Sequence, residues 1–238
     1  MAASDMRRRT LLIAAGACVL AACQRESPNP RPPAPGPARP PDAAFGEVIR
    51  MYDRDVMDVL RRLPTTSLTP DEARARERGT TLVPPASAAD LEALERRIGK
   101  PLPPSYRAFL TMTDGMMFEG FLNQVMLLRA SEVKPLTASE FPGIGVWFSM
   151  PDAAVPLAPE AGGPLPGSAL RRAWMISSVE DGDTYFIFPE LEGSDGEWPV
   201  WFFGPKNPGA YGYRSFRAML ERERDAALRN LSQRRQVR

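Results

Sequence analysis

The chain has 238 residues, with 30 Lys or Arg against 29 Asp or Glu, no histidine and two cysteines. The lack of histidine removes the usual general base near neutral pH, the Ser-His and Cys-His pairs of nucleophilic enzymes, and the commonest zinc ligand. A net charge of +1 gives no global attraction for nucleic acid. The composition therefore predicts neither a histidine-dependent enzyme nor a nucleic-acid partner.

The first 22 residues have the pattern of an export signal. Three arginines at positions 7–9 precede an apolar run from Leu11 to Ala22. A helix needs about 20 residues to cross a hydrocarbon core, so this run is too short to span a membrane but fits the core of a signal peptide. The run ends in Leu20-Ala21-Ala22-Cys23, which resembles the lipobox of bacterial lipoproteins.

The lipobox resemblance implies that residues 1–22 are removed and that Cys23 becomes the lipidated first residue. We therefore expect an exported protein, lipid-anchored on the periplasmic face of the inner or outer membrane. Cys18 lies in the removed segment, so no disulfide is expected. A plain secretory signal, with Cys23 incidental, is the alternative. Arg8-Arg9-Thr10-Leu11-Leu12 also resembles a twin-arginine signal, which leaves two export routes open.

Residues 23–42 predict a tether. Eight prolines lie among the fifteen residues from Ser27 to Pro41. Proline fixes its backbone angle and lacks an amide donor, so neither a helix nor a sheet ladder is expected. As an extended polyproline segment at about 3.1 Å per residue, the fifteen residues would span roughly 45 Å, enough to lift a domain clear of lipid headgroups. A proline-motif ligand for a partner domain is the alternative.

Residues 43–85 predict a helical extension. From Ala44 to Pro64, apolar side chains recur at three- and four-residue steps, which predicts one amphipathic helix. Thr69-Pro70-Asp71-Glu72 then supplies the N-cap, first-turn proline and capping-box acid of a shorter helix ending before Gly79. Because residues 73–78 have no large apolar side chain, we expect that second helix to be solvent-exposed.

Two further helices follow in close succession. Ser87-Ala88-Ala89-Asp90 is a capping pattern, and Gly99 suits a left-handed C-terminal stop, so a helix is predicted over residues 87–98. Prolines at 101, 103 and 104 open a second helix, whose inner face carries Tyr106, Phe109 and Leu110 and which ends at Asp114-Gly115.

Strands are predicted after Gly120. Five apolar runs, each bounded by Gly, Pro, Asp or Ser, are rich in aromatic and branched residues: Phe121 to Leu128, Ile144 to Met150, Ala173 to Val179, Thr184 to Phe188 and Val200 to Phe203. Glu180-Asp181-Gly182-Asp183 predicts a tight hairpin turn between two of them. A last amphipathic helix is expected from about Ser215, with four side chains inward, namely Phe216, Met219, Leu220 and Ala227.

The ordered set of motifs from about Ser87 to Leu228 resembles the SUKH superfamily, the Smi/Knr-like domain. The motifs are the first helix and its glycine, Leu102-Pro103-x-x-Tyr106-x-x-Phe109-Leu110, Asp114-Gly115, and Ile176 to Asp183 in the sheet. The chain departs from the family pattern at Asp114, where asparagine is frequent, at Met116 and Met117, where a glycine often follows Gly115, and in a loop from Pro151 to Ser168 that resembles an insertion.

This resemblance implies one α+β domain over residues 86–230, with a mixed or antiparallel sheet of about five strands flanked by helices. The N-terminal helix is then an addition, and residues 231–238 form a basic tail. The family implies a binding protein without catalysis or cofactor, most often an immunity protein that neutralises a bacterial toxin by occlusive binding. An envelope scaffold that recruits a partner or a cell-wall component is the alternative.

The candidate partner-binding residues are Asp181, Asp183 and Trp198. The two aspartates flank the hairpin glycine, and Trp198 lies beside the turn Asp195-Gly196-Glu197, where we expect it to be an exposed anchor. The other tryptophans, Trp147, Trp174 and Trp201, are expected in the core.

The acids near the hairpin also suggest two other kinds of site. A carboxylate hydrolase would need a pair among Glu180, Asp181, Asp183 and Glu190, but hairpin-turn acids are usually exposed. A calcium site at Asp181, Asp183 and Asp195 lacks the twelve-residue loop pattern. No metal site is therefore predicted.

Overall fold

A computed structural model describes residues 43–119, 124–149, 167–204 and 210–233. Residues 39–238 form one compact unit. The predicted signal peptide, Cys23 and the tether lie outside the described residues. In the part of the chain that the structure describes, no helix is both long enough and apolar enough to cross a membrane.

The chain folds into α-helices, short 3-10 helices and seven short strands within these ranges. The α-helices are α1 (Ala43–Arg62), α2 (Pro70–Arg78), α3 (Ala88–Ile98), α4 (Pro104–Met112), α5 (Gly145–Phe148), α6 (Gly167–Leu170) and α7 (Phe216–Gln233). The 3-10 helices are η1 (Thr65–Ser67), η2 (Pro142–Ile144) and η4 (Pro189–Leu191). The strands are β1 (Met116–Glu119), β2 (Gln124–Leu127), β3 (Lys134–Pro135), β4 (Trp174–Met175), β5 (Thr184–Ile187), β6 (Val200–Phe203) and β7 (Ala210–Tyr213).

Five strands form an antiparallel sheet in the order β3-β4-β5-β6-β7. The strands β1 and β2 form an antiparallel pair of their own. An isolated bridge between Leu127 of β2 and Ser177, just beyond β4, connects this pair to the sheet. The α+β class, the antiparallel sheet and the flanking helices predicted from the sequence are confirmed.

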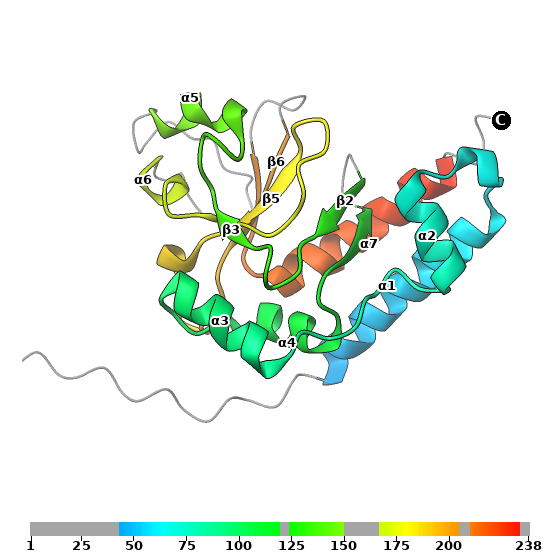
Figure 1. The fold of residues 1–238 in the computed structure, drawn as a ribbon, viewed down its shortest axis with the longest axis horizontal. Coiled ribbons are helices and arrows are strands. Elements are labelled where there is room, and N and C mark those ends of the chain that lie inside the picture. Colours follow the sequence, from blue (N-terminus) through cyan, green and yellow to red (C-terminus); the bar gives the residue numbers. More distant parts are fainter. Residues whose placement is uncertain (1–42, 120–123, 150–166, 205–209, 234–238) are drawn as a thin grey trace, which may run out of the picture. The chain divides into compact units, whose positions relative to one another are not determined.

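Both faces of the five-stranded sheet are buried. Alternate side chains of β5 and β6, including Tyr185 and Phe202, enter one apolar cluster with α1, α4 and α7. The opposite side chains, including Phe186 and Trp201, enter a second cluster with η2 and α6. Figure 1 shows α5 and α6 on one side of β5 and β6, and α1 and α7 on the other. The sheet is therefore the middle layer of three.

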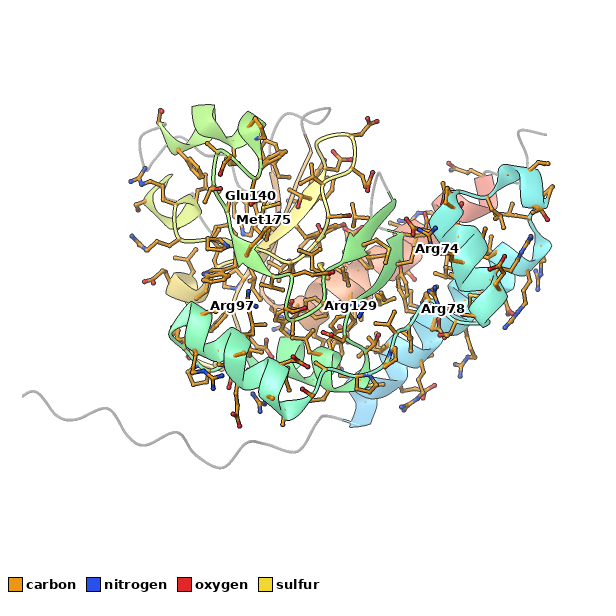
Figure 2. The ribbon with its side chains drawn as sticks, viewed as in Figure 1. Arg74, Arg78, Arg97, Arg129, Glu140 and Met175 are labelled. Atoms are coloured by element: carbon orange, nitrogen blue, oxygen red, sulfur yellow. The ribbon has the colours of Figure 1, made fainter. Side chains whose placement is uncertain are left out.

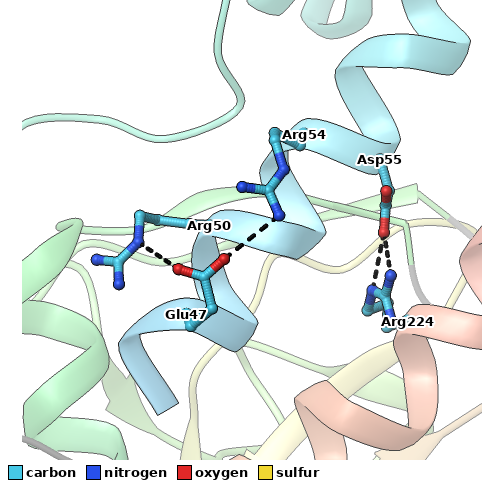
Figure 3. A network of polar contacts seen from close by, with 5 residues as sticks. All are labelled: Glu47, Arg50, Arg54, Asp55 and Arg224. Atoms are coloured by element: carbon cyan, nitrogen blue, oxygen red, sulfur yellow. Dashed lines mark hydrogen bonds and ion pairs between the residues drawn. The ribbon is translucent and has the colours of Figure 1, made fainter. Parts of the chain in front are cut away.

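The N-terminal helix α1 belongs to the same core as the sheet. Tyr52 stacks on Phe118 of β1 with ring centroids 5.5 Å apart. Arg224 of α7 donates two hydrogen bonds to Asp55 of α1 (Figure 3). On the exposed surface of α1, Glu47 accepts hydrogen bonds from Arg50 and Arg54. The extension predicted over residues 43–85 therefore supplies one of the helices that cover the sheet.

The predicted helix pair is confirmed in detail. Ser87 and Asp90 form a capping box at the start of α3, and Gly99 ends it with φ +82°. On α4, Tyr106 and Phe109 are buried and lie 4.9 and 4.8 Å, by ring centroids, from Phe216 of α7. This aromatic group connects the pair to the last helix, whose four predicted inward side chains are all buried.

The turn after α4 is fixed by Asp114 and Gly115. Asp114 accepts a hydrogen bond from Ala130 N at 2.7 Å, a contact that the carbonyl oxygen of an asparagine could also accept. Gly115 has φ +96°, and a Cβ there would lie 2.5 Å from the carbonyl oxygen of Leu127. The family departure at Asp114 is thus compatible with the turn, and only glycine fits at position 115.

Three sequence predictions of structure were wrong. The described part of the run from Ile144 is not a strand: Ile144 ends η2, which Pro142 opens, and belongs to the second apolar cluster, and α5 follows it. The helix over residues 70–78 is not fully exposed, since Glu72 and Ala75 are buried. The apolar run from Ala173 is a regular strand only at Trp174–Met175; Ile176 still donates to Tyr185 O of β5, and Ile176 and Ser178 also bond with the strand β2 and its next residue.

Other strands were missed or mislocated. β1 lies directly after the turn at Asp114-Gly115, before the strand that the sequence predicted, and β3 and β7 were not predicted. In contrast, β6 covers Val200–Phe203 and β5 covers Thr184–Ile187, so the two central strands are confirmed. Two-residue strands such as β3 are too short for a periodic signal.

We predict that Phe109→Ala destabilises the domain by about 3 to 5 kcal/mol, because it removes a fully buried ring from the junction of α4 and α7. The control, Thr111→Ala on the exposed side of the same helix, should change the free energy of unfolding by less than about 0.5 kcal/mol. Urea melts of both variants measure this. A loss below about 1 kcal/mol in Phe109→Ala would contradict the packing described.

Candidate partner-binding surface

Several strand ends lie at one end of the sheet, which we call the turn end. There β5 begins at Thr184, β6 ends at Phe203, and β7 begins at Ala210. The end of β1 and the start of β2 lie in the same direction, since β2 runs antiparallel to the segment after β4. Figure 1 shows these strand ends directed toward one side of the molecule. Loops at one end of a rigid sheet commonly carry binding residues.

The hairpin at the turn end has the predicted geometry. Glu180 and Asp183 exchange backbone hydrogen bonds of 3.1 and 2.8 Å. Between them Asp181 has φ +55° and Gly182 has φ +86°, the backbone of a type I′ turn. Both Glu180 and Asp181 are exposed, so the turn presents two carboxylates on a fixed backbone.

A β-bulge lies directly before this turn. Glu180 pairs with Asp183, and Ile176 N donates to Tyr185 O, so Ser177, Ser178 and Val179 lie opposite Thr184 alone, which is two residues more than a regular ladder needs. Ser178 is held by Met126 of β2, whose carbonyl accepts a 2.8 Å bond from Ser178 N and whose amide donates to the Ser178 hydroxyl. The bulge leaves Val179 36% exposed, and among the described residues only Tyr211 on β7 is another large apolar side chain of similar exposure.

Asp183, a predicted contact residue, is completely buried. A Cβ added to Gly204 would lie 2.7 Å from Asp183 Oδ1. The carboxylate therefore packs against Gly204, the residue directly after β6. The expectation that all the hairpin acids are exposed was therefore wrong for Asp183. Asp183 lies two residues before Tyr185 in extended chain, so its side chain is directed to the same face of the sheet.

Other polar groups are buried inside the domain. The Tyr52 hydroxyl donates to Glu119 O at 3.0 Å and accepts from Glu119 N at 2.7 Å. Burial, and then the neighbouring charges of Glu119 and Glu223, raise the pKa of Tyr52 well above its usual value. The Tyr213 hydroxyl donates to Glu223 on α7. Polar groups thus lie between the sheet and its helices, with Glu119 at the turn end and Tyr213 at the other end of β7, where it pairs with Val200.

The opposite end of the sheet is filled by the segment from Pro189 to Trp198. Trp198, predicted to be an exposed anchor, is only 1% exposed, so that prediction of exposure was wrong. Lys100, at the end of α3, lies 5.7 Å above the indole ring, pairs with Glu192 at 2.5 Å and donates to Pro189 O at 2.8 Å. A lysine 98 residues away in sequence thereby covers the ring, which no local pattern could indicate.

Glu197 ties this segment to two helices. Its carboxylate accepts bonds from Ser105 N at 3.0 Å and from the Ser105 hydroxyl at 2.6 Å, at the start of α4. Ser105 Oγ in turn accepts from Arg217 N at 3.3 Å, at the start of α7. Burial raises the pKa of Glu197, although the two bonds from Ser105 act in the opposite direction. No local pattern indicates this contact, since Ser105 and Glu197 are far apart in the chain.

The described residues contain no group of three or more His, Cys, Asp or Glu side chains placed to hold a metal ion. The acids considered for a hydrolase are also separated, because Glu180 and Asp183 lie at the turn end while Glu190, near Arg172, lies at the other end.

Comparison with protein families shows the family to which this chain belongs. Residues 85–222 match the SMI1/KNR4 family, also called SUKH-1. The chain belongs to this family. The match begins just before α3 and ends within α7, so it covers the sheet and both predicted motif helices. A comparison with curated proteins found no significant match. The SUKH superfamily includes immunity proteins, and its domains generally bind other proteins, which supports a protein partner.

We predict that Glu197→Gln stabilises the domain relative to the unchanged chain as pH rises from 4 to 7. The folded-state pKa of Glu197 is raised, so its contribution to stability is present at low pH and is lost as the carboxyl ionises, whereas glutamine does not titrate. Urea melts at several pH values measure the difference. Ser105→Ala removes a hydrogen bond that lowers this pKa. In that background, the stability difference between glutamine and glutamate at position 197 should rise more steeply with pH. A difference that is flat or falls with pH would contradict the assignment.

Proposed function

We propose that this SUKH domain is a membrane-tethered immunity-type protein that neutralises a toxin by covering part of its surface. Family membership carries the proposal, because the superfamily includes immunity proteins and its domains generally bind proteins. The lipobox and the proline-rich segment support an envelope location, and the composition without histidine supports binding rather than turnover.

The turn end of the sheet is the contact surface in this proposal. Both sheet faces are occupied by apolar clusters, and the opposite end is filled by Trp198 and its neighbours. Val179 and Asp181 remain as an exposed apolar side chain beside an exposed carboxylate on a rigid turn. Rigid presentation lowers the entropy that a contact costs on binding. Of the three predicted contact residues, Asp181 therefore stays in the proposal, while Asp183 supports the turn from beneath.

Cys23 is the proposed lipid attachment site. Two or more acyl chains, at about 0.8 kcal/mol per buried methylene, give a stable anchor. We predict that the full chain incorporates a fatty-acid analogue during growth and stays with membranes washed in about 1 M salt, where charge attraction is screened within roughly 3 Å, and that Cys23→Ala abolishes both. Cys18→Ala, inside the segment expected to be removed, is the matched control and should leave labelling unchanged. An unlabelled wild-type chain would contradict the lipoprotein assignment.

The contact surface is tested by two conservative changes at the hairpin. Val179→Ser removes apolar area, and Asp181→Asn removes a charge while keeping a residue type that tolerates the positive φ of this turn. We predict that the double variant binds the toxin at least tenfold more weakly by calorimetry, with an unchanged circular dichroism spectrum. Asp225→Asn, an exposed acid on α7, is the control and should bind normally.

The toxin for this test is one encoded beside the chain, and survival of cells that produce both proteins reports neutralisation. Equal affinity of the double variant and the control would place the contact elsewhere on the domain. Binding without protection from any such toxin would favour an envelope scaffold over an immunity protein.

A further inference from the structure

Arginines gather on three helices, α1, α2 and α7. None of the turn-end strands belongs to this group. The second half of α1, α2 and the part of α7 from Arg222 onward together carry nine arginines and no lysine: Arg54, Arg61, Arg62, Arg74, Arg76, Arg78, Arg222, Arg224 and Arg229. We call this surface the arginine end. The same segments hold eight acids, of which Glu72 and Glu223 are buried, so six acids remain against nine arginines.

The three segments are held together by direct contacts. Helix α1 packs on both α2 and α7. Arg224 of α7 bonds Asp55 of α1, and Arg76 of α2 donates to Leu63 O at 2.9 Å just after α1 ends. Figure 2 labels Arg74 and Arg78 on α2, the helix that packs on α1. The arginines therefore form one surface of the folded domain and are not merely spread through the sequence.

Several of these side chains remain available for an outside ligand. Arg62, Arg78 and Arg229 are exposed and form no ion pair within the described residues. A guanidinium group presents a planar fork of donors that fits a phosphate oxygen pair. The surface therefore suits phosphate groups carried on a negatively charged surface.

The rest of the domain has the opposite charge. Residues 173–204, which contain β4, β5, β6 and the hairpin, carry seven acids and no Lys or Arg. The whole family-matched region, residues 85–222, has 17 acidic against 12 basic residues. Charge is thus separated between the sheet and the arginine end.

We propose that the arginine end docks on the phosphate headgroups of the anionic membrane to which the chain is tethered, and that the acidic sheet faces away. Residues 24–42 separate Cys23 from α1, and at about 3.1 Å per residue they reach roughly 60 Å. This exceeds the length of the 20-residue α1, about 30 Å, so the far end of α1 can meet the bilayer. The orientation rests on the proposed lipid anchor, but the affinity of the surface does not.

The test uses residues 39–238, the compact unit, which carries no lipid site. Sedimentation with vesicles is measured at about 50 mM salt. At this concentration the Debye length exceeds about 10 Å, so charges on the protein still attract the headgroups. Vesicles of phosphatidylglycerol mixed with phosphatidylcholine should bind the fragment at least tenfold better than phosphatidylcholine alone. The triple change Arg62→Glu, Arg78→Glu and Arg229→Glu should remove that preference, and the milder changes to Gln should reduce it severalfold.

The control reverses three exposed arginines elsewhere, Arg96→Glu, Arg129→Glu and Arg172→Glu, with the same change in net charge. It should keep most of the preference for phosphatidylglycerol. An equal loss in both triple variants, with melts showing both folded, would assign the effect to net charge and overturn the docking surface. Failure of the unchanged fragment to prefer phosphatidylglycerol would also overturn it, whereas a failed lipid-labelling experiment on Cys23 would overturn the anchor alone.

Discussion

Burial of both faces of the five-stranded sheet is the constraint on which the rest of the structure depends. Phe186 and Trp201 enter one cluster while Tyr185 and Phe202 enter the other, so no face of the sheet is left to bind a partner. Large aromatic side chains are well suited to this role because each buries much apolar area. Recognition must then use the strand ends or the outer helices. Trp198 and Glu197 fill one end, which leaves the turn end and the helical surface.

The helices outside the family match complete this arrangement. The matched region begins after α1 and α2, yet Tyr52 of α1 packs on Phe118 and bonds the backbone of Glu119. A SUKH domain built on this chain therefore uses its N-terminal helix as part of the covering layer. The same helix connects the domain to the predicted tether, and its second half contributes to the arginine end. One element thus links the proposed anchor, the core and the proposed membrane contact.

Local signals in the sequence predicted local structure well. The capping box at Ser87, the left-handed stop at Gly99 and the turn at Asp181-Gly182 each depend on residues within four positions of one another, and all are present. Predictions that needed distant partners failed. Trp198 is covered by Lys100, Asp183 is buried against Gly204, and Ile144 is drawn into a cluster with Phe186. The bulge that exposes Val179 depends on β2, so the sequence could not indicate it either.

The central claim is that the turn end of a tethered SUKH domain contacts a protein. Site-specific photo-crosslinking in intact cells tests it most directly, with a crosslinking amino acid placed at Val179 and, as a control, at the exposed Arg96 on α3. The account predicts a defined protein adduct from position 179 and none from position 96. Equal adducts from both positions, or adducts from position 96 alone, would contradict the claim.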